Sequence, residues 1–332
     1  MDFNGKLLKK LVDAYSPSGN EMEIKEVIKE EIKEYVDEIK VDALGNLIAR
    51  KKGNGKKIMI AGHMDQIGMM VTDIDEKGFV RFTNVGGISP HISLNQRIIF
   101  ENGTVGIIHV EKIDDISKLK LENLFIDIGA TSKEEAEQKV NIGDVCVYNT
   151  EYHEDDNRVM TRALDDRVGC YVMIEAMKRL KNSENDIYFV FTVQEELGLR
   201  GARTSAYGVN PDVGIAIDVT GTGDTPKARR FAVGLDKGTA IKVKDNSILV
   251  HPKVKELMVN TAKENNINYQ MEVLEFGGTD SGAIHLTREG VPSGVISIPT
   301  RYIHSSSEVA SKKDINASVD LLVELLNKKI EI

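Results

Sequence analysis

The sequence predicts an α/β fold, with a mostly parallel sheet covered by helices on both faces and interrupted by a small β-rich, barrel-like insertion. Continuous apolar segments typical of buried parallel strands alternate with amphipathic segments typical of helices. Between residues 68 and 157 the alternation gives way to short β-favouring runs separated by Gly, Asn and Asp. The length of 332 residues also favours more than one domain. We therefore expect a larger domain of residues 1–67 and 158–332 and an inserted domain of residues 68–157.

The elements of the larger domain follow from its apolar patterns. Ser18 is the expected N-cap of the first helix, because Glu21 follows it at the spacing of a capping box. In the insertion, the pair Asn102-Gly103 between two β-favouring runs predicts a hairpin. We expect strands at residues 57–61, 187–193, 213–217 and 294–298, and helices at residues 166–180, 252–265 and 317–329.

Composition and charge exclude several classes of protein. The chain is 41% hydrophobic and 29% charged, as in ordinary soluble proteins, and it has no apolar run of the roughly 20 residues that span a membrane. Its N-terminus does not resemble a secretion signal, so we expect a cytoplasmic protein. The net charge of -9 opposes binding to nucleic acid and to anionic membranes. Cys146 and Cys170 are isolated, which argues against disulfides and against a thiolate zinc site.

Residues that bind metals well follow four of the expected strands. Because ligands of open α/β sheets bind outside the carboxyl ends of the strands, we expect these side chains to converge at one edge. A helix that starts near the same edge is preceded by one more carboxylate. The residues are His63 after the first strand, Glu195 and Glu196 after the second, Asp218 after the third, His304 after the fourth, and Asp165 before the helix that begins at Asp166.

Taken singly, each of these residues is more often a helix cap or a solvated loop residue. Together, two histidines and several carboxylates would crowd negative charge into one crevice, which is costly unless cations neutralise it. Imidazole and carboxylate ligands without a thiolate suit zinc, cobalt or manganese better than calcium or a structural zinc ion. Asp65, two residues after His63 and so on the same face of an extended chain, is expected to orient the imidazole of His63, and the alternative is a solvated turn residue.

Other catalytic signatures are missing from the sequence. It contains no G-x-S-x-G elbow, no H-E-x-x-H helix, no Walker loop and no G-x-G-x-x-G after a strand. The glycine-rich segment 276–282 either lines a substrate pocket or forms a structural turn, and the sequence leaves both interpretations open.

Six strings of residues, collinear along nearly the whole chain, resemble the TET-type metallo-aminopeptidases of metallopeptidase family 42, which include glutamyl and deblocking aminopeptidases. The resemblance implies a peptidase domain interrupted by a β-rich dimerisation domain, assembly into tetrahedral dodecamers, and removal of N-terminal residues from peptides with a free N-terminus. It also implies two divalent metal ions, zinc or cobalt. The strings are AGHMDQIGMMV, RALDDRVGCYV, FTVQEELGLRGA, IAIDVT, FGGTDSGAI and IPTRYIHSSSEV.

The resemblance assigns a role to each candidate residue. It implies that His63 and Asp218 bind one metal ion, that Glu196 and His304 bind the other, that Asp165 bridges the two, and that Glu195 is the general base. A bridging metal-bound hydroxide, formed because two close cations acidify water, would attack the peptide bond. Glu195 and Glu196 point to opposite sides if the chain there is extended, so one can bind metal while the other faces the water.

Three other functions remain open on the sequence alone. Paired carboxylates also serve an endoglucanase-like glycoside hydrolase, although the chain has no Trp for sugar stacking and that reaction needs no histidine pair. A related metal-dependent deacylase is a nearer alternative, and a non-catalytic protein with the same fold is a third. The sequence does not indicate which N-terminal residue is preferred. Cations that would suit an acidic substrate side chain are Lys237, Lys242, Lys244, His251 and Arg301.

Overall fold

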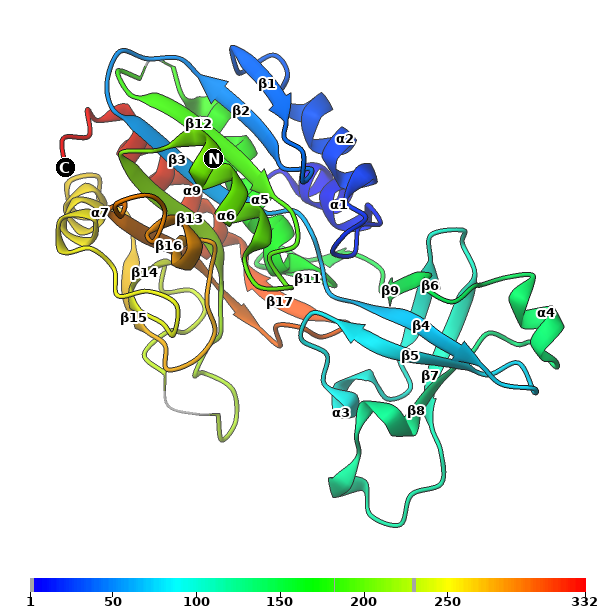
Figure 1. Ribbon diagram of the computed structural model, residues 1–332. Helices are drawn as coiled ribbons and strands as arrows, with labels where there is room; N and C mark the ends of the chain where they lie inside the picture. The colour runs from blue at the N-terminus through cyan, green and yellow to red at the C-terminus, as the bar shows by residue number, and fades with distance from the viewer. Residues whose placement is uncertain (1–2, 182, 229–230) are drawn as a thin grey trace.

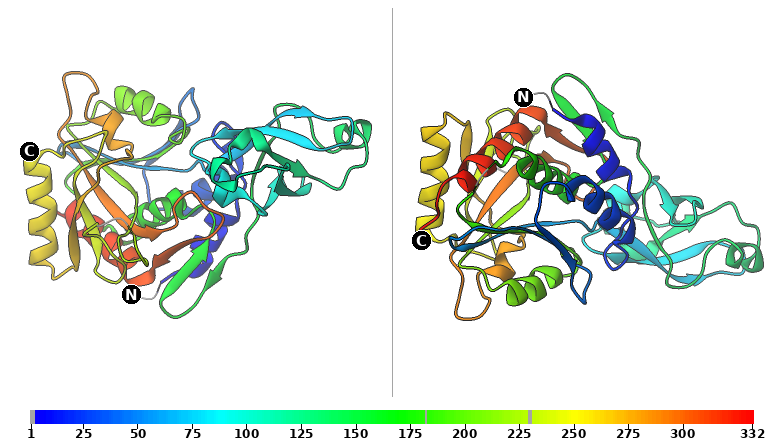
Figure 2. Two further views of the ribbon diagram at one scale, coloured as in Figure 1. Left: turned by 90° about the horizontal axis from the view of Figure 1, so that it is seen from below. Right: turned by 90° about the horizontal axis from the view of Figure 1, so that it is seen from above.

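A computed structural model describes residues 3–181, 183–228 and 231–332 of the chain. The described residues form two lobes, a larger one built on a wide sheet and a smaller one built on a closed barrel (Figure 1). The two lobes also lie side by side when the molecule is seen from below and from above (Figure 2). This arrangement confirms the predicted α/β fold with a β-rich insertion.

The larger lobe is organised by four parallel strands at the centre of its sheet. Their spatial order is β12 (Asp186–Thr192), β3 (Lys57–His63), β13 (Val213–Thr220) and β16 (Ser293–Arg301). Every residue of β13 is buried, which explains why these strands appear in the sequence as continuous apolar runs. Antiparallel neighbours extend the sheet beyond β12 and beyond β16. They are β1 (Glu38–Val41), β2 (Leu47–Lys51), β10 (His153–Glu154), β11 (Arg158–Thr161), β14 (Thr239–Lys244) and β17 (Glu308–Ser311), and β15 (Tyr269–Val273) pairs parallel to β14.

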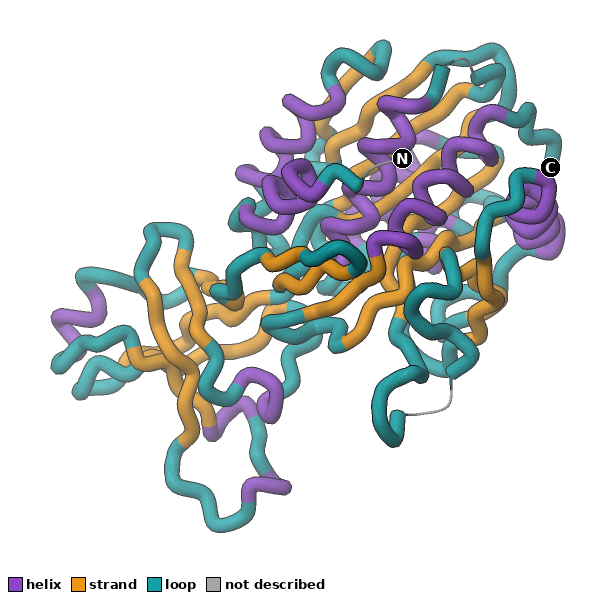
Figure 3. The backbone as a smooth tube through the Cα atoms, turned by 180° about the vertical axis from the view of Figure 1, so that it is seen from behind, coloured by secondary structure: helices purple, strands orange, loops and turns teal. Residues whose placement is uncertain are grey.

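Helices cover both faces of this sheet because successive side chains of each strand point to opposite faces. On β3, Ile58 and Ile60 belong to the core under one group of helices, whereas Met59 and Ala61 belong to the core under the other. The first group, seen from behind in Figure 3, consists of α1 (Gly5–Asp13), α2 (Met22–Ile32), α5 (Leu164–Arg179), α7 (Pro252–Glu264) and α9 (Lys312–Asn327). The second group consists of α6 (Arg200–Val209) and α8 (Ser281–Ile284).

The smaller lobe is a closed antiparallel barrel with its own apolar core. Asn102 and Gly103 form the turn between two of its strands, as predicted. In order around the barrel the strands are β4 (Gly68–Ile74), β5 (Val80–Val85), β8 (Leu124–Asp127), β7 (Val105–Val110), β6 (Arg97–Phe100) and β9 (Val145–Tyr148). Short helices accompany them: α3 (Pro90–Ser93), α4 (Lys133–Glu137), and the 3-10 turns Ile116–Lys118 and Leu121–Asn123. Strand β10, within residues 68–157, pairs with β11 of the larger sheet, and the domain boundaries themselves stay a prediction.

Two details differ from the sequence prediction. The helix expected to be first is α2, which α1 precedes. Ser18 does not cap α2, because its hydroxyl group donates to the Asp65 carboxylate at 2.6 Å, and the residue that precedes the helix is Glu21. The strands also continue further than their apolar runs, so that His63 and Asp218 lie within β3 and β13 and not beyond them. Sheet hydrogen bonding therefore extends through the polar residues, which fixes their directions. No helix in the described ranges is long and apolar enough to cross a membrane.

Close packing at the start of α6 gives a stability prediction. A Cβ atom on Gly201 would lie 2.4 Å from the Val193 carbonyl oxygen and 2.3 Å from Asn46 Oδ1. We expect Gly201→Ala to lower the free energy of unfolding by about 1–3 kcal/mol, because neither neighbour has room to move. Gly208, on the same helix with no atom within 4 Å of such a Cβ, is the matched control. Gly208→Ala should stabilise by about 0.5–1 kcal/mol. Urea unfolding measures both, and a Gly201→Ala chain as stable as the original would contradict the packing.

Candidate metal centre

The candidate residues from distant parts of the sequence meet at the carboxyl edge of the central strands. The parallel register places Thr192, the last residue of β12, beside His63, the last residue of β3. The residues that follow Thr192, including Glu195 and Glu196, therefore lie near His63. The others arrive on separate elements: Asp218 within β13, Asp165 in the first turn of α5, and His304 in the loop between β16 and β17.

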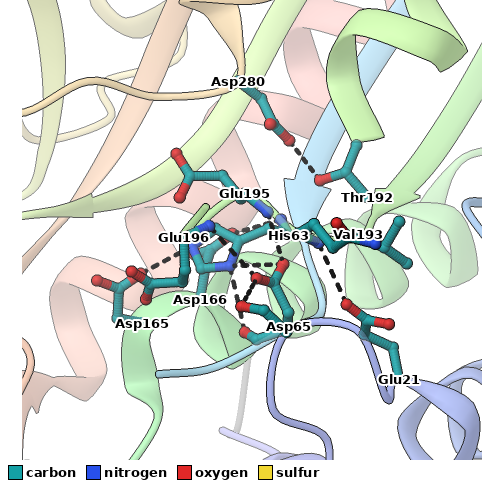
Figure 4. A network of polar contacts seen from close by, with 12 residues as sticks. Glu21, His63, Asp65, Asp165, Asp166, Thr192, Val193, Glu195, Glu196 and Asp280 are labelled. Atoms are coloured by element: carbon teal, nitrogen blue, oxygen red, sulfur yellow. Dashed lines mark hydrogen bonds and ion pairs between the residues drawn. The ribbon is translucent and has the colours of Figure 1, made fainter. Parts of the chain in front are cut away.

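Asp165 lies between the two histidines. Its Oδ1 atom is 2.9 Å from His63 Nε2, and its Oδ2 atom is 3.2 Å from His304 Nε2. His304 Nε2 is also 3.2 Å from Glu196 Oε1. Figure 4 shows Asp165 and Glu196 pointing toward each other beside the ring of His63. A carboxylate with one oxygen toward each of two imidazoles has the geometry of a group that is shared between two ligand sets.

Asp218 belongs to the same cluster, with a neighbour that sequence reasoning missed. Ligand atoms of His63, Asp166 and Asp218 all lie within 4.8 Å of one another, as do those of His63, Asp165 and Glu196. The fully buried Asp166 carboxylate accepts the amide N–H groups of His63 at 3.2 Å and Gly169 at 3.0 Å. The paired aspartates of the RALDD string were the available signal, but only the first was interpreted as functional.

The electrostatics of the cluster favour bound cations. Burial, and then the charge of Asp165, raises the pKa of Asp218 well above its usual value. Burial and then Asp218 raise the pKa of Asp166. Burial alone would lower the pKa of His304, but Glu196 and Asp165 raise it instead. The site thus concentrates negative charge and draws positive charge to itself, and its nitrogen and oxygen donors without a thiolate fit zinc or a similar divalent ion.

The cluster opens into a cleft with a volume of about 690 Å³. Glu195 lines the cleft, and burial, with further contributions from Asp218 and Glu196, raises the pKa of its carboxyl group despite the opposing effect of His63. The barrel lobe contributes Gly87, where a Cβ atom would lie 2.7 Å from His304 Nδ1, so this loop must pass close to the histidine. Sequence reasoning did not single out Gly87, since nothing local marks it.

The turn that carries Glu195 and Glu196 is not extended, so the sequence argument about opposite sides of a strand was wrong. Gln194 has a left-handed backbone with φ of 53°. The Asp65 carboxylate accepts the amide N–H of Glu195 at 3.0 Å and of Glu196 at 3.3 Å. The two glutamate side chains nevertheless point apart in Figure 4. Asp65 is buried, its Oδ1 atom lies 3.6 Å from His63 Nδ1, and it is therefore no solvated turn residue.

Glu308 is a second buried carboxylate that sequence reasoning missed. It accepts the amide N–H of Asp165 at 3.0 Å and the amide N–H of His304 at 2.9 Å. Burial, and then Asp165, raises its pKa to about 8. Glu308 thus fixes the backbones of two candidate ligands, Asp165 and His304. The only signal was its place four residues after His304 in the last string.

The glycine-rich segment 276–282 fits both interpretations left open above. Phe276, Gly277 and Gly278 line the cleft, whereas Asp280 accepts a hydrogen bond from Thr192 at the end of β12. Of the five candidate cations, Lys242 and Arg301 line the cleft. Neither is available for an acidic substrate without rearrangement. Lys242 Nζ lies 2.5 Å from Glu272 Oε1, and Arg301 binds Asp224 through two nitrogens at 3.0 and 2.9 Å.

Comparisons with solved structures agree with this architecture. An aminopeptidase from the archaeon Desulfurococcus kamchatkensis is 40% identical, with a TM-score of 0.94 over 97% of this chain and 94% of that one. The TET1 peptidase of Pyrococcus horikoshii, described as assembling into a tetrahedron or a large octahedral shell, is 35% identical, with a TM-score of 0.87 over 97% and 98% of the two chains. A Thermotoga maritima protein described as an endoglucanase is 34% identical, with a TM-score of 0.82 over 96% of each chain.

Comparisons of sequence give the family. The lysyl aminopeptidase of Pyrococcus furiosus is 37% identical over 97% of this chain and 96% of its own length. A protein of Acetivibrio thermocellus that carries a provisional aminopeptidase name is 56% identical over 96% of this chain and 97% of its own. The family model described as M42 glutamyl aminopeptidase matches residues 45–321. The chain therefore belongs to the M42 glutamyl aminopeptidase family of peptide hydrolases.

Proposed function

We propose that this protein is a dinuclear metal-dependent aminopeptidase that removes N-terminal residues from peptides. The observation that carries the proposal is the position of Asp165, with one carboxylate oxygen toward His63 and the other toward His304. Family membership supports aminopeptidase activity and divalent metal ions, and the cluster supplies suitable donors.

The residues divide into two ligand sets around Asp165. His63 and Asp218 would hold one cation, because their ligand atoms lie within 4.8 Å of each other. Glu196 and His304, whose atoms are 3.2 Å apart, would hold the other. Asp165 would bridge the two cations. The Asp166 carboxylate is occupied by two backbone N–H groups, so its proposed part is to fix the peptide around His63.

The proposed chemistry divides between the cations and Glu195. Zinc or cobalt ions bound here would acidify water and act as Lewis acids on the peptide carbonyl oxygen. Glu195 would take a proton from the attacking water on its carboxylate oxygen and then deliver it to the nitrogen of the departing peptide. Burial raises the pKa of this carboxyl group, which makes it a stronger proton acceptor than an exposed glutamate.

Asp65 would fix the position of His63 relative to Glu195 and Glu196. Its carboxylate holds the amides of Glu195 and Glu196, and it lies 3.6 Å from the Nδ1 atom of His63, whose Nε2 atom faces Asp165. One buried carboxylate thus orients a ligand on β3 and the turn that follows β12. Free substrate α-amino groups are cationic and would be drawn to the acidic end of the cleft, which fits action at the N-terminus.

Assembly is part of the proposal, because the Pyrococcus horikoshii relative can assemble into a tetrahedron or a large octahedral shell. In the barrel lobe, Val105 and Ile107 of β7 are 40% and 49% exposed on one strand, as expected for a surface that another copy covers. We propose that the barrel is a dimerisation domain and that the dimers form a dodecamer. Light scattering would contradict this if it gave the mass of a single 36.8 kDa chain.

Replacing the proposed proton carrier should separate catalysis from metal binding. We expect Glu195→Gln to lower kcat by about 10²–10⁴-fold on aminoacyl anilides, because the amide cannot move the proton. Metal content, measured by mass spectrometry, should stay unchanged. The exposed Glu289 is the matched control, and Glu289→Gln should have the original kcat. A near-normal kcat in Glu195→Gln would end the assignment.

Metal removal separates the proposal from sugar hydrolysis and from a non-catalytic protein. We expect a chelator to abolish anilide hydrolysis and added zinc or cobalt to restore it, because neither the ligand set nor Glu195 replaces the Lewis acid. Hydrolysis of N-acyl amino acids alone would favour a deacylase. Activity on cellulose that survives the chelator would favour a two-carboxylate glycosidase.

A further inference from the structure

The turn that follows β12 is held by two buried carboxylates from other parts of the chain. Asp65 accepts the amide N–H groups of Glu195 and Glu196, as described above. Glu21 Oε1 accepts the amide N–H of the preceding residue, Gln194, at 3.2 Å. The amides of three consecutive residues are therefore held by carboxylates, and Figure 4 shows Glu21 reaching the turn from the N-terminal part of the chain.

The contact from Glu21 falls on a residue of the turn whose backbone conformation is unfavourable for a side chain other than glycine. Gln194 has φ of 53°, in the left-handed region that side chains other than glycine rarely occupy. Immediately afterwards the chain reverses, with the Glu195 carbonyl accepting the N–H groups of Gly198 at 2.8 Å and Leu199 at 2.9 Å. The direction in which Glu195 leaves the backbone therefore depends on the conformation of Gln194.

Glu21 is itself rigidly placed. Its Oε1 atom also accepts the N–H of Gly19 at 2.7 Å. The adjoining segment pairs with the chain just beyond β3, through Ser18 N–H to the Gln66 carbonyl at 3.1 Å and Gln66 N–H to the Ser16 carbonyl at 3.2 Å. Ser16 in turn accepts a hydrogen bond from the buried Arg167 at 2.6 Å. The segment that carries Glu21 thus rests on the same elements as His63 and Asp165.

The environment of Glu21 does not suit a residue selected for stability alone. Its side chain is buried, it forms no ion pair within residues 3–181, 183–228 and 231–332, and the Asp65 carboxylate lies nearby. A buried carboxylate without a cation is costly, so a polar group here is best explained by what it holds in place. Among the described residues, the side-chain hydrogen bond of Glu21 that reaches beyond its own loop is the one to the turn that bears Glu195.

We propose that Glu21 is a positioning residue for Glu195: by accepting the amide N–H of Gln194 it holds the left-handed turn that aims the Glu195 carboxylate into the cleft. The inference rests on the proposed function, in which Glu195 transfers the proton. Glu21 lies outside both the cleft and the metal cluster, so a segment remote from the chemistry would help to set the catalytic geometry.

Two substitutions separate the hydrogen bond from the charge. Glu21→Gln keeps an oxygen at the same reach and loses the charge, so we expect kcat to stay within about threefold of the original. Glu21→Asp keeps the charge and withdraws the oxygen by one methylene, so we expect kcat to fall about 10–100-fold. KM and metal content should stay unchanged in both. Hydrogen exchange of the amides in residues 192–199 should rise in Glu21→Asp and not in Glu21→Gln.

Glu23 provides the matched control. It lies in the same segment, where its Oε2 atom accepts the Tyr15 N–H at 3.1 Å, and Glu23→Asp should change neither kcat nor exchange in residues 192–199. An original kcat in Glu21→Asp, or a Glu21→Gln variant as defective as Glu21→Asp, would overturn the inference. Exchange that rises throughout the chain, with a lowered Tm, would also overturn it in favour of a general structural role. If the original chain cleaves no anilide, the proposed function fails, while the exchange comparison still tests the contact.

Discussion

The structure depends on one electrostatic constraint, the gathering of several buried carboxylates around Asp165 at a single edge of the sheet. Like charges at this spacing raise one another's pKa and oppose folding unless positive charge is supplied. Two imidazoles meet Asp165 directly, and the donor set fits divalent cations. The apolar core must therefore stabilise the fold enough to maintain a cluster that would be unfavourable without bound ions.

Parallel strands explain how such a cluster is assembled from distant sequence. In register, β12 and β3 end side by side, so His63 and the turn after Thr192 share one rim. Behind that rim, backbone N–H groups are held by buried carboxylates, with Asp65 at the glutamate turn and Glu308 at the amides of Asp165 and His304. Asp65 and Glu308 thus orient, through backbone N–H groups, the residues whose side chains form the cluster. The role inferred for Glu21 is of the same kind, because its carboxylate accepts the amide N–H of Gln194.

The sequence predicted the fold class because buried parallel strands leave continuous apolar runs, and it predicted which residues meet because polar residues at the ends of such strands share an edge. It does not reveal the roles of Asp166 and Glu308, because those roles lie in backbone N–H groups that only the folded chain brings near. Ser18 was misjudged for the same reason. Its capping-box spacing is a local signal, and a tertiary hydrogen bond to Asp65 replaced the local one. The glutamate turn was misjudged because its left-handed Gln194 has no sequence signature.

The proposed function requires two cations, one on either side of Asp165. Crystals grown with zinc and measured at the zinc absorption edge test this most directly, because anomalous scattering locates the ions independently of activity. We expect two peaks, one near His63 and Asp218 and the other near Glu196 and His304, each at about 2.0–2.2 Å from the ligand atoms. Peaks remote from Asp165, or a single ion bound without it, would rule out the proposed dinuclear centre.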